Sequence, residues 1–153
     1  MYENALMLHS FLRWLALLAV LFAFVRAFSG WMGDRPRTTL DKASAMVALI
    51  VVDLQLLTGL LMYFLWSPLT KIARDDMGAA MKDDQLRFWG VEHATTMLIA
   101  VALVHVGKIL ANKSKSPRSQ HGRAVLCFGI ALMLMVWMTP WPMSHVPRPW
   151  FRT

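Results

Sequence analysis

Hydrophobic residues in this chain gather in four long blocks, which short polar segments separate. The blocks cover about residues 5–28, 43–66, 86–111 and 122–139. Each approaches the roughly 20 apolar residues that a helix needs to cross the hydrocarbon core of a bilayer. Ser67-Pro68 ends the second block and Pro140 ends the fourth, as expected where a helix stops. The pattern therefore predicts four transmembrane helices.

The connections between the blocks predict how these helices pack. Short connections make consecutive helices antiparallel neighbours, so we expect an all-α, up-down-up-down four-helix bundle. In that arrangement the first and third helices run parallel on diagonal corners of the bundle. Residues 1–153 are predicted to form one domain, with residues 140–153 as a tail at the membrane interface. Residues 71–85, in the second connection, are candidates for a short amphipathic surface helix.

Composition supports an integral membrane protein. Hydrophobic residues make up 57% of the chain and charged residues only 16%, whereas about a quarter of a soluble domain is charged. The net charge of +7 lies mostly in the connections, so we interpret it as a topology signal and not as a nucleic-acid-binding surface. The single cysteine, Cys127, excludes an intrachain disulfide.

The distribution of basic residues predicts the orientation. Nine of the 16 Lys and Arg residues lie in or beside the first and third connections. Cytoplasmic connections carry an excess of Lys and Arg, so both termini are expected on the opposite side of the membrane. Trp14, Trp66, Trp89, Trp141 and Trp150 would then gather near that outer interface, where indole rings prefer to lie.

Polar residues inside the predicted spans are the candidate functional residues. They are expensive in a bilayer and usually face the interior of a bundle. The set comprises His9, Arg13, Asp53, Gln55, Glu92, His93 and His105.

His9 and His93 form the most informative pair in this set. His9 lies about one turn from the outer end of the first helix and His93 about two turns from the outer end of the third. Imidazole is a common axial ligand of haem iron, and bundle interiors hold such cofactors between facing helices. We therefore predict one haem b per chain, with His9 and His93 as axial ligands. Arg13, one turn after His9, is placed to neutralise a propionate or a partner carboxylate.

Neighbouring residues fit the same hypothesis. Gly59 and Gly90 fall at a similar depth and would leave room for a flat macrocycle. Glu92 is expected to pair with Arg13 or Arg87, and with His93 it would also suit a quinol head group. A structural alternative stays open, because glycine is common where membrane helices cross and an interfacial histidine often only bonds a neighbour.

Asp53, Gln55 and His105 are predicted to form a proton or polar network deeper in the membrane. An ionised Asp there needs a partner, either His105 or another subunit. His105 lies twelve residues after His93 and therefore about 120° from its face, which argues against a second haem.

Three segments resemble a group of small bacterial four-helix membrane proteins labelled cytochrome b-like. They are LHSFLRW at 8–14, DLQLLTGLLMYF at 53–64 and DMGAAMKDDQLRFWGVEH at 76–93. The resemblance covers most of the chain except the tail, and it implies that His9 and His93 are the matching histidines. It also implies a multi-pass protein of the bacterial inner membrane, with periplasmic termini if the charge bias holds.

Three functions remain open at this stage. The first is a b-type electron carrier that works with quinol, or quinone, or with other membrane redox subunits. The second is a cofactor-free accessory subunit of a respiratory or photosynthetic complex, and the third is a small proton or ion transporter. We expect an electron carrier or complex subunit more than a stand-alone enzyme. The expected partners are the lipid bilayer, other redox subunits or a second copy of the chain, and no nucleic acid.

Overall fold

The computed structural model describes residues 1–151 and contains no β-strand in that range. Its elements are α1 (Tyr2–Met32), α2 (Thr39–Leu61), η1 (Met62–Trp66), α3 (Pro68–Asp75), α4 (Met77–Ala80), α5 (Asp84–Arg87), η2 (Phe88–Glu92), α6 (His93–Lys113) and α7 (Pro117–Met138). Four continuous helical stretches are long and apolar enough to cross a membrane: Tyr2–Met32, Thr39–Trp66, Asp84–Lys113 and Pro117–Met138. The predicted all-α membrane bundle is confirmed.

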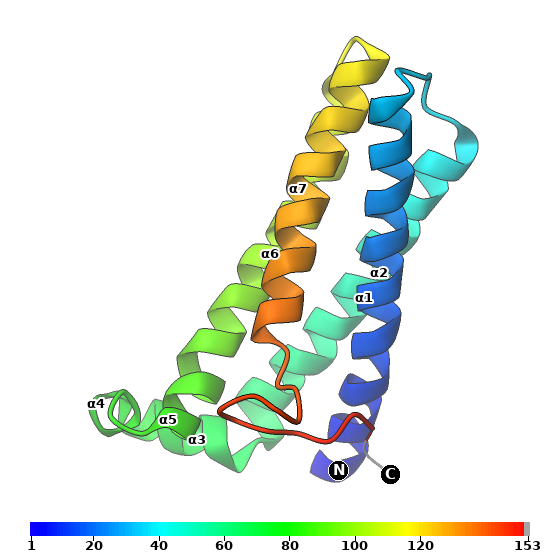
Figure 1. Ribbon diagram of the computed structural model, residues 1–153. Helices are drawn as coiled ribbons and strands as arrows, with labels where there is room; N and C mark the ends of the chain where they lie inside the picture. The colour runs from blue at the N-terminus through cyan, green and yellow to red at the C-terminus, as the bar shows by residue number, and fades with distance from the viewer. Residues whose placement is uncertain (152–153) are drawn as a thin grey trace.

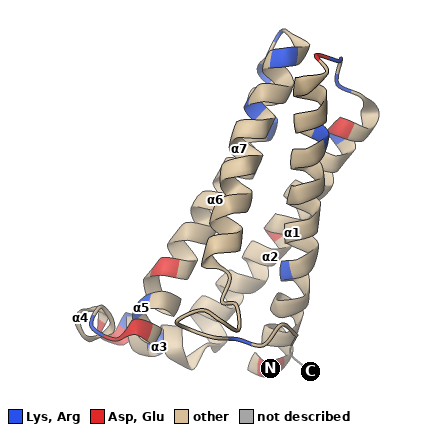
Figure 2. Ribbon diagram, in the orientation of Figure 1, with Lys and Arg blue, Asp and Glu red and all other residues tan. Residues whose placement is uncertain are grey.

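The four long helices pack in the predicted order around the bundle. α1 packs against α2 and α7, and α6 packs against α7 and α2, so α1 and α6 occupy diagonal corners. The α1–α2 pair and the α6–α7 pair lie close together at the end that carries the first and third connections (Figure 1). They diverge towards the other end, which holds both termini and is called the termini end below (Figure 1). Charged residues gather near the two ends of the bundle, and most of its length is uncharged (Figure 2).

Small residues form most of the helix-helix interfaces. The buried core contains many alanines, namely Ala16, Ala23, Ala27, Ala45, Ala48, Ala100, Ala111, Ala124 and Ala131, with Phe128 as its largest side chain. Small side chains let membrane helices approach closely, and the resulting van der Waals contact drives their association. Large apolar side chains such as Leu18, Leu57 and Leu126 are instead exposed on the outside of the bundle. This inversion is expected where the solvent is lipid.

Gly107 provides a test of this packing between α6 and α7. A Cβ atom at Gly107 would lie 2.7 Å from the Cβ atom of Cys127 on α7. Because that atom is fixed to the α7 backbone, Gly107→Ala is expected to destabilise the bundle by about 1–3 kcal/mol, as overpacking does. Unfolding by a denaturing detergent, followed by circular dichroism, measures the change. Gly78→Ala is the matched control, since its Cβ atom would meet nothing closer than 3.5 Å. Equal stability of the two variants would contradict the close approach of α6 and α7 at Gly107.

The helices begin earlier than the hydrophobic blocks predict. The second span begins at Thr39 and the fourth at Pro117, not at 43 and 122. Polar caps explain the difference: Thr38 forms a capping box with Asp41, and the Ser116 side chain accepts a hydrogen bond from the Ser119 amide. Capped first turns are polar. The hydropathy pattern therefore marks the apolar part of each helix and not its true start.

A buried ion cluster joins α1 to α2 at the end opposite the termini. The carboxylate of Asp41 is 3% exposed. It accepts hydrogen bonds from Arg26 Nε at 3.0 Å and from both terminal nitrogens of Arg35. The bond to Asp41 raises the pKa of Arg35, which keeps that guanidinium charged. The cluster fixes the path of the first connection.

The second connection folds at the termini end. It contains α3, which begins after the Ser67 cap, and the short helices α4 and α5. A short helix was expected at 71–85, and most of that range is helical, but the helix is divided among α3, α4 and the start of α5. These helices project sideways from the base of α6 (Figure 1). Gly90 lets α3 approach, because a Cβ atom there would lie 2.6 Å from Ala73 Cβ.

Candidate functional site

A cavity of about 390 Å³ lies at the termini end, where the helix pairs diverge. It is lined from α1, from α2 with η1, from η2 with α6, and from the end of α7. Among the predicted site residues, the lining includes His9, Arg13, Gln55, Gly59, Gly90 and His93. Sites for small molecules and cofactors have volumes of roughly 300–1,000 Å³ and mostly apolar walls with a few polar groups. The cavity has that character.

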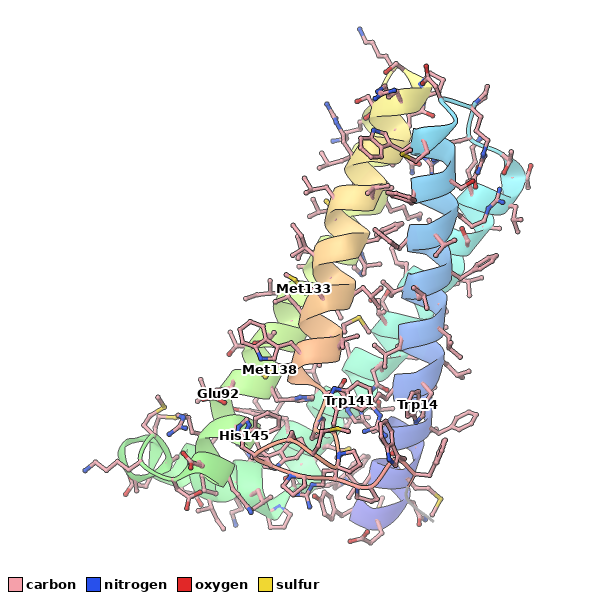
Figure 3. The ribbon with its side chains drawn as sticks, in the orientation of Figure 1. Trp14, Glu92, Met133, Met138, Trp141 and His145 are labelled. Atoms are coloured by element: carbon pink, nitrogen blue, oxygen red, sulfur yellow. The ribbon has the colours of Figure 1, made fainter. Side chains whose placement is uncertain are left out.

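The C-terminal tail lies across this end of the bundle. Figure 3 shows the tail passing below α7, with Trp141 beside Trp14 of α1. The Trp150 carbonyl accepts hydrogen bonds from Arg13 Nη2 at 2.8 Å and from Trp14 Nε1 at 3.2 Å. Val146 is buried, at 2% exposure. The tail, predicted only as interfacial, therefore covers part of the cavity; its last residues, Arg152 and Thr153, lie outside the described range.

His9 is held by two side chains of α2. Its Nδ1 lies 3.1 Å from Thr58 Oγ1, and its Nε2 lies 3.2 Å from the Gln55 amide nitrogen. Thr58 Oγ1 donates its own proton to the backbone carbonyl of Gln55 at 2.9 Å, and it therefore accepts the hydrogen bond from His9 Nδ1–H. Nε2 then carries the lone pair, which accepts from the Gln55 amide. Gly59 permits this approach, because a Cβ atom there would lie 3.1 Å from His9 Cε1.

His93 is held in a similar way from α7. Its Nδ1 lies 3.0 Å from the Met138 carbonyl oxygen, so Nδ1–H is the donor. No hydrogen bond reaches its Nε2 from any residue that the structure describes. The rings of Phe88 and Trp89 pack against the imidazole, at 5.7 and 5.4 Å between centroids. Both histidines thus present Nδ1 to a neighbouring helix and retain the lone pair on Nε2.

Three buried polar atoms around the cavity have no hydrogen-bond partner among residues 1–151. They are Arg13 Nε, Trp89 Nε1 and Gln55 Oε1, and all three residues line the cavity. Buried polar groups without partners are uncommon in folded proteins, and each is destabilising. Two of the three atoms are donors, so the wall is suited to a ligand that brings acceptors.

Glu92 and Gly90 each have a neighbour outside the cavity. Glu92 pairs with Arg87, one of its two expected partners, through Arg87 Nε and Glu92 Oε1 at 2.8 Å, and no ion pair with Arg13 is present among the described residues. Glu92 is absent from the cavity lining. Gly90 lines the cavity, but its missing side chain makes room for Ala73 of α3. Gly90 therefore has a packing explanation that needs no cofactor.

The predicted polar network separates into two parts. Asp53 Oδ1 lies 2.8 Å from His105 Nε2, as one of the expected pairings required. Neither residue lines the cavity, and their side chains are 43% and 40% exposed. Gln55, two residues from Asp53, faces α1 instead. Within residues 1–151, no group of three or more His, Cys, Asp or Glu side chains is arranged to hold a metal ion.

Sequence reasoning missed Thr58, Trp89 and the Met138 carbonyl. Both Thr58 and Trp89 were within the quoted segments. Trp89 lies one turn before His93 on the same helical stretch, so that contact could have been found from the spacing. Only the register between α1 and α2 shows that Thr58 meets His9. Two π-helical turns, η1 and η2, also flank the cavity. Such turns often occur at functional sites. Here the Tyr63 hydroxyl of η1 donates to the Gly90 carbonyl of η2 at 2.8 Å.

Comparison with known proteins adds no assignment. No protein family, no curated protein and no solved structure matches this chain. The resemblance to cytochrome b-like proteins therefore stays a prediction.

Proposed function

We propose that the cavity binds one haem b, with His9 and His93 as axial ligands, and that the protein transfers electrons within a membrane. The observation that carries the proposal is the matched pair of histidines. They come from diagonal helices, line one cavity, and each has its Nδ1 bonded to an acceptor on an adjacent helix. Histidines that bind metals almost always donate their second ring nitrogen in this way, which fixes the ring and raises its basicity.

The Nε2 atoms are suitable for ligation. His93 Nε2 has no hydrogen bond from the described residues, and His9 Nε2 has only the Gln55 amide at 3.2 Å. One neutral hydrogen bond contributes about 0.5–1.5 kcal/mol net, so iron coordination would readily replace the Gln55 contact. The bond from His9 Nδ1 to Thr58 would remain.

The unpartnered donors suit the carboxylates of a haem. Arg13 Nε and Trp89 Nε1 are buried without acceptors, and haem propionates are acceptors with negative charge. Arg148 also lines the cavity, with its guanidinium 5.2 Å from the Trp89 ring centroid. Arginine binds carboxylates strongly because its fork of N–H groups matches their two oxygens.

When bound, the haem would supply one-electron redox chemistry. The chain would hold it through the two histidines, neutralise its propionates and exclude water by the apolar walls and the tail, all of which tune a haem potential. The excess of Lys and Arg in the first and third connections supports a termini end on the periplasmic side of a bacterial inner membrane. A quinol or a larger redox complex would exchange electrons with it there.

Haem titration tests this proposal. Protein purified from haem-deficient cells is mixed with haem in detergent, and the Soret band is followed to saturation. We expect one haem per chain by the pyridine haemochrome assay. A Soret absorbance that rises continuously with added haem and does not saturate would contradict the proposal.

The Thr58 contact gives a quantitative prediction. Thr58→Val removes the acceptor for His9 Nδ1–H, and loss of such an orienting partner typically weakens metal binding 10–100-fold. We expect a rise of that order in the haem dissociation constant. Thr95→Val is the control, because Thr95 lines the same cavity and has no hydrogen bond to either histidine. Equal affinity of the two variants would exclude a role for Thr58.

A quinol head group is the second candidate. Gln55 Oε1 is a buried acceptor without a donor, and a quinol hydroxyl would satisfy it. Solvent extraction of the purified protein, followed by chromatography of the extract, measures bound quinone. Quinone at one per chain without haem would favour this reading over the haem reading.

A further inference from the structure

The Asp53–His105 pair lies on the outer surface of the bundle, although it is deep within two spans. Asp53 is near the middle of the Thr39–Trp66 span, and His105 lies within the Asp84–Lys113 span. Their side chains are bonded at 2.8 Å, yet are 43% and 40% exposed, and they lie outside the cavity. Ionisable residues inside membranes almost always face protein or a water-filled cavity, because lipid cannot solvate them.

The surface around the pair is mostly apolar, although Lys108, one turn after His105, lies on the same face with its Nζ 3.5 Å from Met46 Sδ of α2. On α2, Ile50 and Leu57 lie one turn to either side of Asp53 and are 49% and 54% exposed. On α6, Ile109 follows His105 by one turn and is 49% exposed. A polar pair in a mostly apolar helix surface is the pattern by which interhelical hydrogen bonds join membrane helices.

The pair has unused hydrogen-bonding capacity of both kinds. The bond between them uses Asp53 Oδ1 and His105 Nε2. Among residues 1–151, nothing bonds to Asp53 Oδ2 or to His105 Nδ1. With one proton in the bond between them and one on His105 Nδ1, each chain therefore offers one acceptor, Asp53 Oδ2, and one donor, His105 Nδ1. The donor and the acceptor of one chain are therefore complementary to the acceptor and the donor of a second copy.

The membrane restricts how a second copy of the chain can be oriented next to these groups. Chains inserted in the same orientation are related by a two-fold axis along the membrane normal, and rotation about that axis preserves depth. Asp53 and His105 lie at one depth, because they are bonded across α2 and α6. The same two residues of a second copy would therefore lie at that depth, with Asp53 of each chain facing His105 of the other.

We infer that the α2–α6 face is a homodimer interface, in which two Asp53–His105 pairs close a four-membered network of hydrogen bonds. The interface is isologous, as in most homodimers. It removes the exposed polar pair from lipid and satisfies the two remaining atoms of each chain. The inference is independent of the haem proposal, because neither residue lines the cavity.

Association in a lipid-like environment tests the inference. Sedimentation equilibrium in density-matched micelles should give wild-type protein twice the chain mass of 17.4 kDa. Asp53→Leu and His105→Leu should each raise the dimer dissociation constant roughly tenfold or more, since two interchain hydrogen bonds are lost. Circular dichroism shows whether each variant keeps its helices. Monomeric wild-type protein would overturn the inference, as would folded leucine variants that dimerise like wild type.

Site-directed cross-linking in membranes identifies the interface. In a Cys127→Ala background, Ile50→Cys should give a dimer with a short bis-maleimide. Ile130→Cys is the matched control, because Ile130 is also exposed, at 37%, but lies on α7, diagonal to α2. Cross-linking through Ile130 alone, or cross-linking of Ile50 only to a different protein, would overturn the inference.

Discussion

Replacing either His9 or His93 with alanine is expected to abolish haem retention. The two imidazoles lie on diagonal helices, and no other histidine lines the cavity among the described residues. A six-coordinate haem that loses one axial ligand also loses the contact with one side of the bundle. We expect the Soret band to fall to background in each variant after detergent purification, at unchanged helix content.

Two other histidines provide controls for this result. His145 is exposed on the tail, and its ring packs edge-on against the Phe88 ring, at 5.4 Å between centroids. His105 is bonded to Asp53 outside the cavity. His145→Ala and His105→Ala should therefore keep one haem per chain. A normal spectrum in both His9→Ala and His93→Ala would end the proposed ligation.

Asp41→Ala is expected to produce the largest loss of stability. The carboxylate is 3% exposed and bonds to Arg26 and Arg35, which are 26% and 28% exposed. Removing one member of a buried ion pair typically destabilises by 3–5 kcal/mol, and loss of the hydrogen bond from the Thr38 amide to Asp41, half of the capping box, adds about 1 kcal/mol. Because both arginines reach water, we discount the total to about 2–4 kcal/mol.

The measurement is unfolding in mixed micelles of mild and denaturing detergent. Asp84→Ala is the matched control, because Asp84 is 75% exposed and pairs with Arg87 at the surface. Such surface pairs contribute about 0–1 kcal/mol. If the Asp41 variant unfolds no more readily than the Asp84 variant, the buried cluster does not hold α1 against α2.

The four spans could be predicted from the sequence because lipid imposes a simple constraint. Backbone groups in a bilayer have to be bonded within the segment, so a long apolar block is a helix. The same block does not show the capped polar turns, and this is why Thr39 and Pro117 were placed outside their helices. Short connections also predicted the diagonal relation of α1 and α6, which is observed.

The site was predicted only in part. His9 and His93 stand out because histidine is expensive in a membrane, and the structure brings them to one cavity. Their partners Thr58 and the Met138 carbonyl depend on helix rotation and on where α7 ends, which no local pattern gives. Glu92 was assigned to the site by proximity in sequence, but its side chain pairs with Arg87.

The most direct test of the central claim is a dithionite-reduced minus oxidised absorption spectrum. The protein is purified in detergent from cells supplied with haem. We predict the α-band of a b-type haem with both axial positions occupied, at one haem per chain. A colourless preparation from these cells would contradict the proposed cytochrome and would favour a cofactor-free subunit of a larger membrane complex.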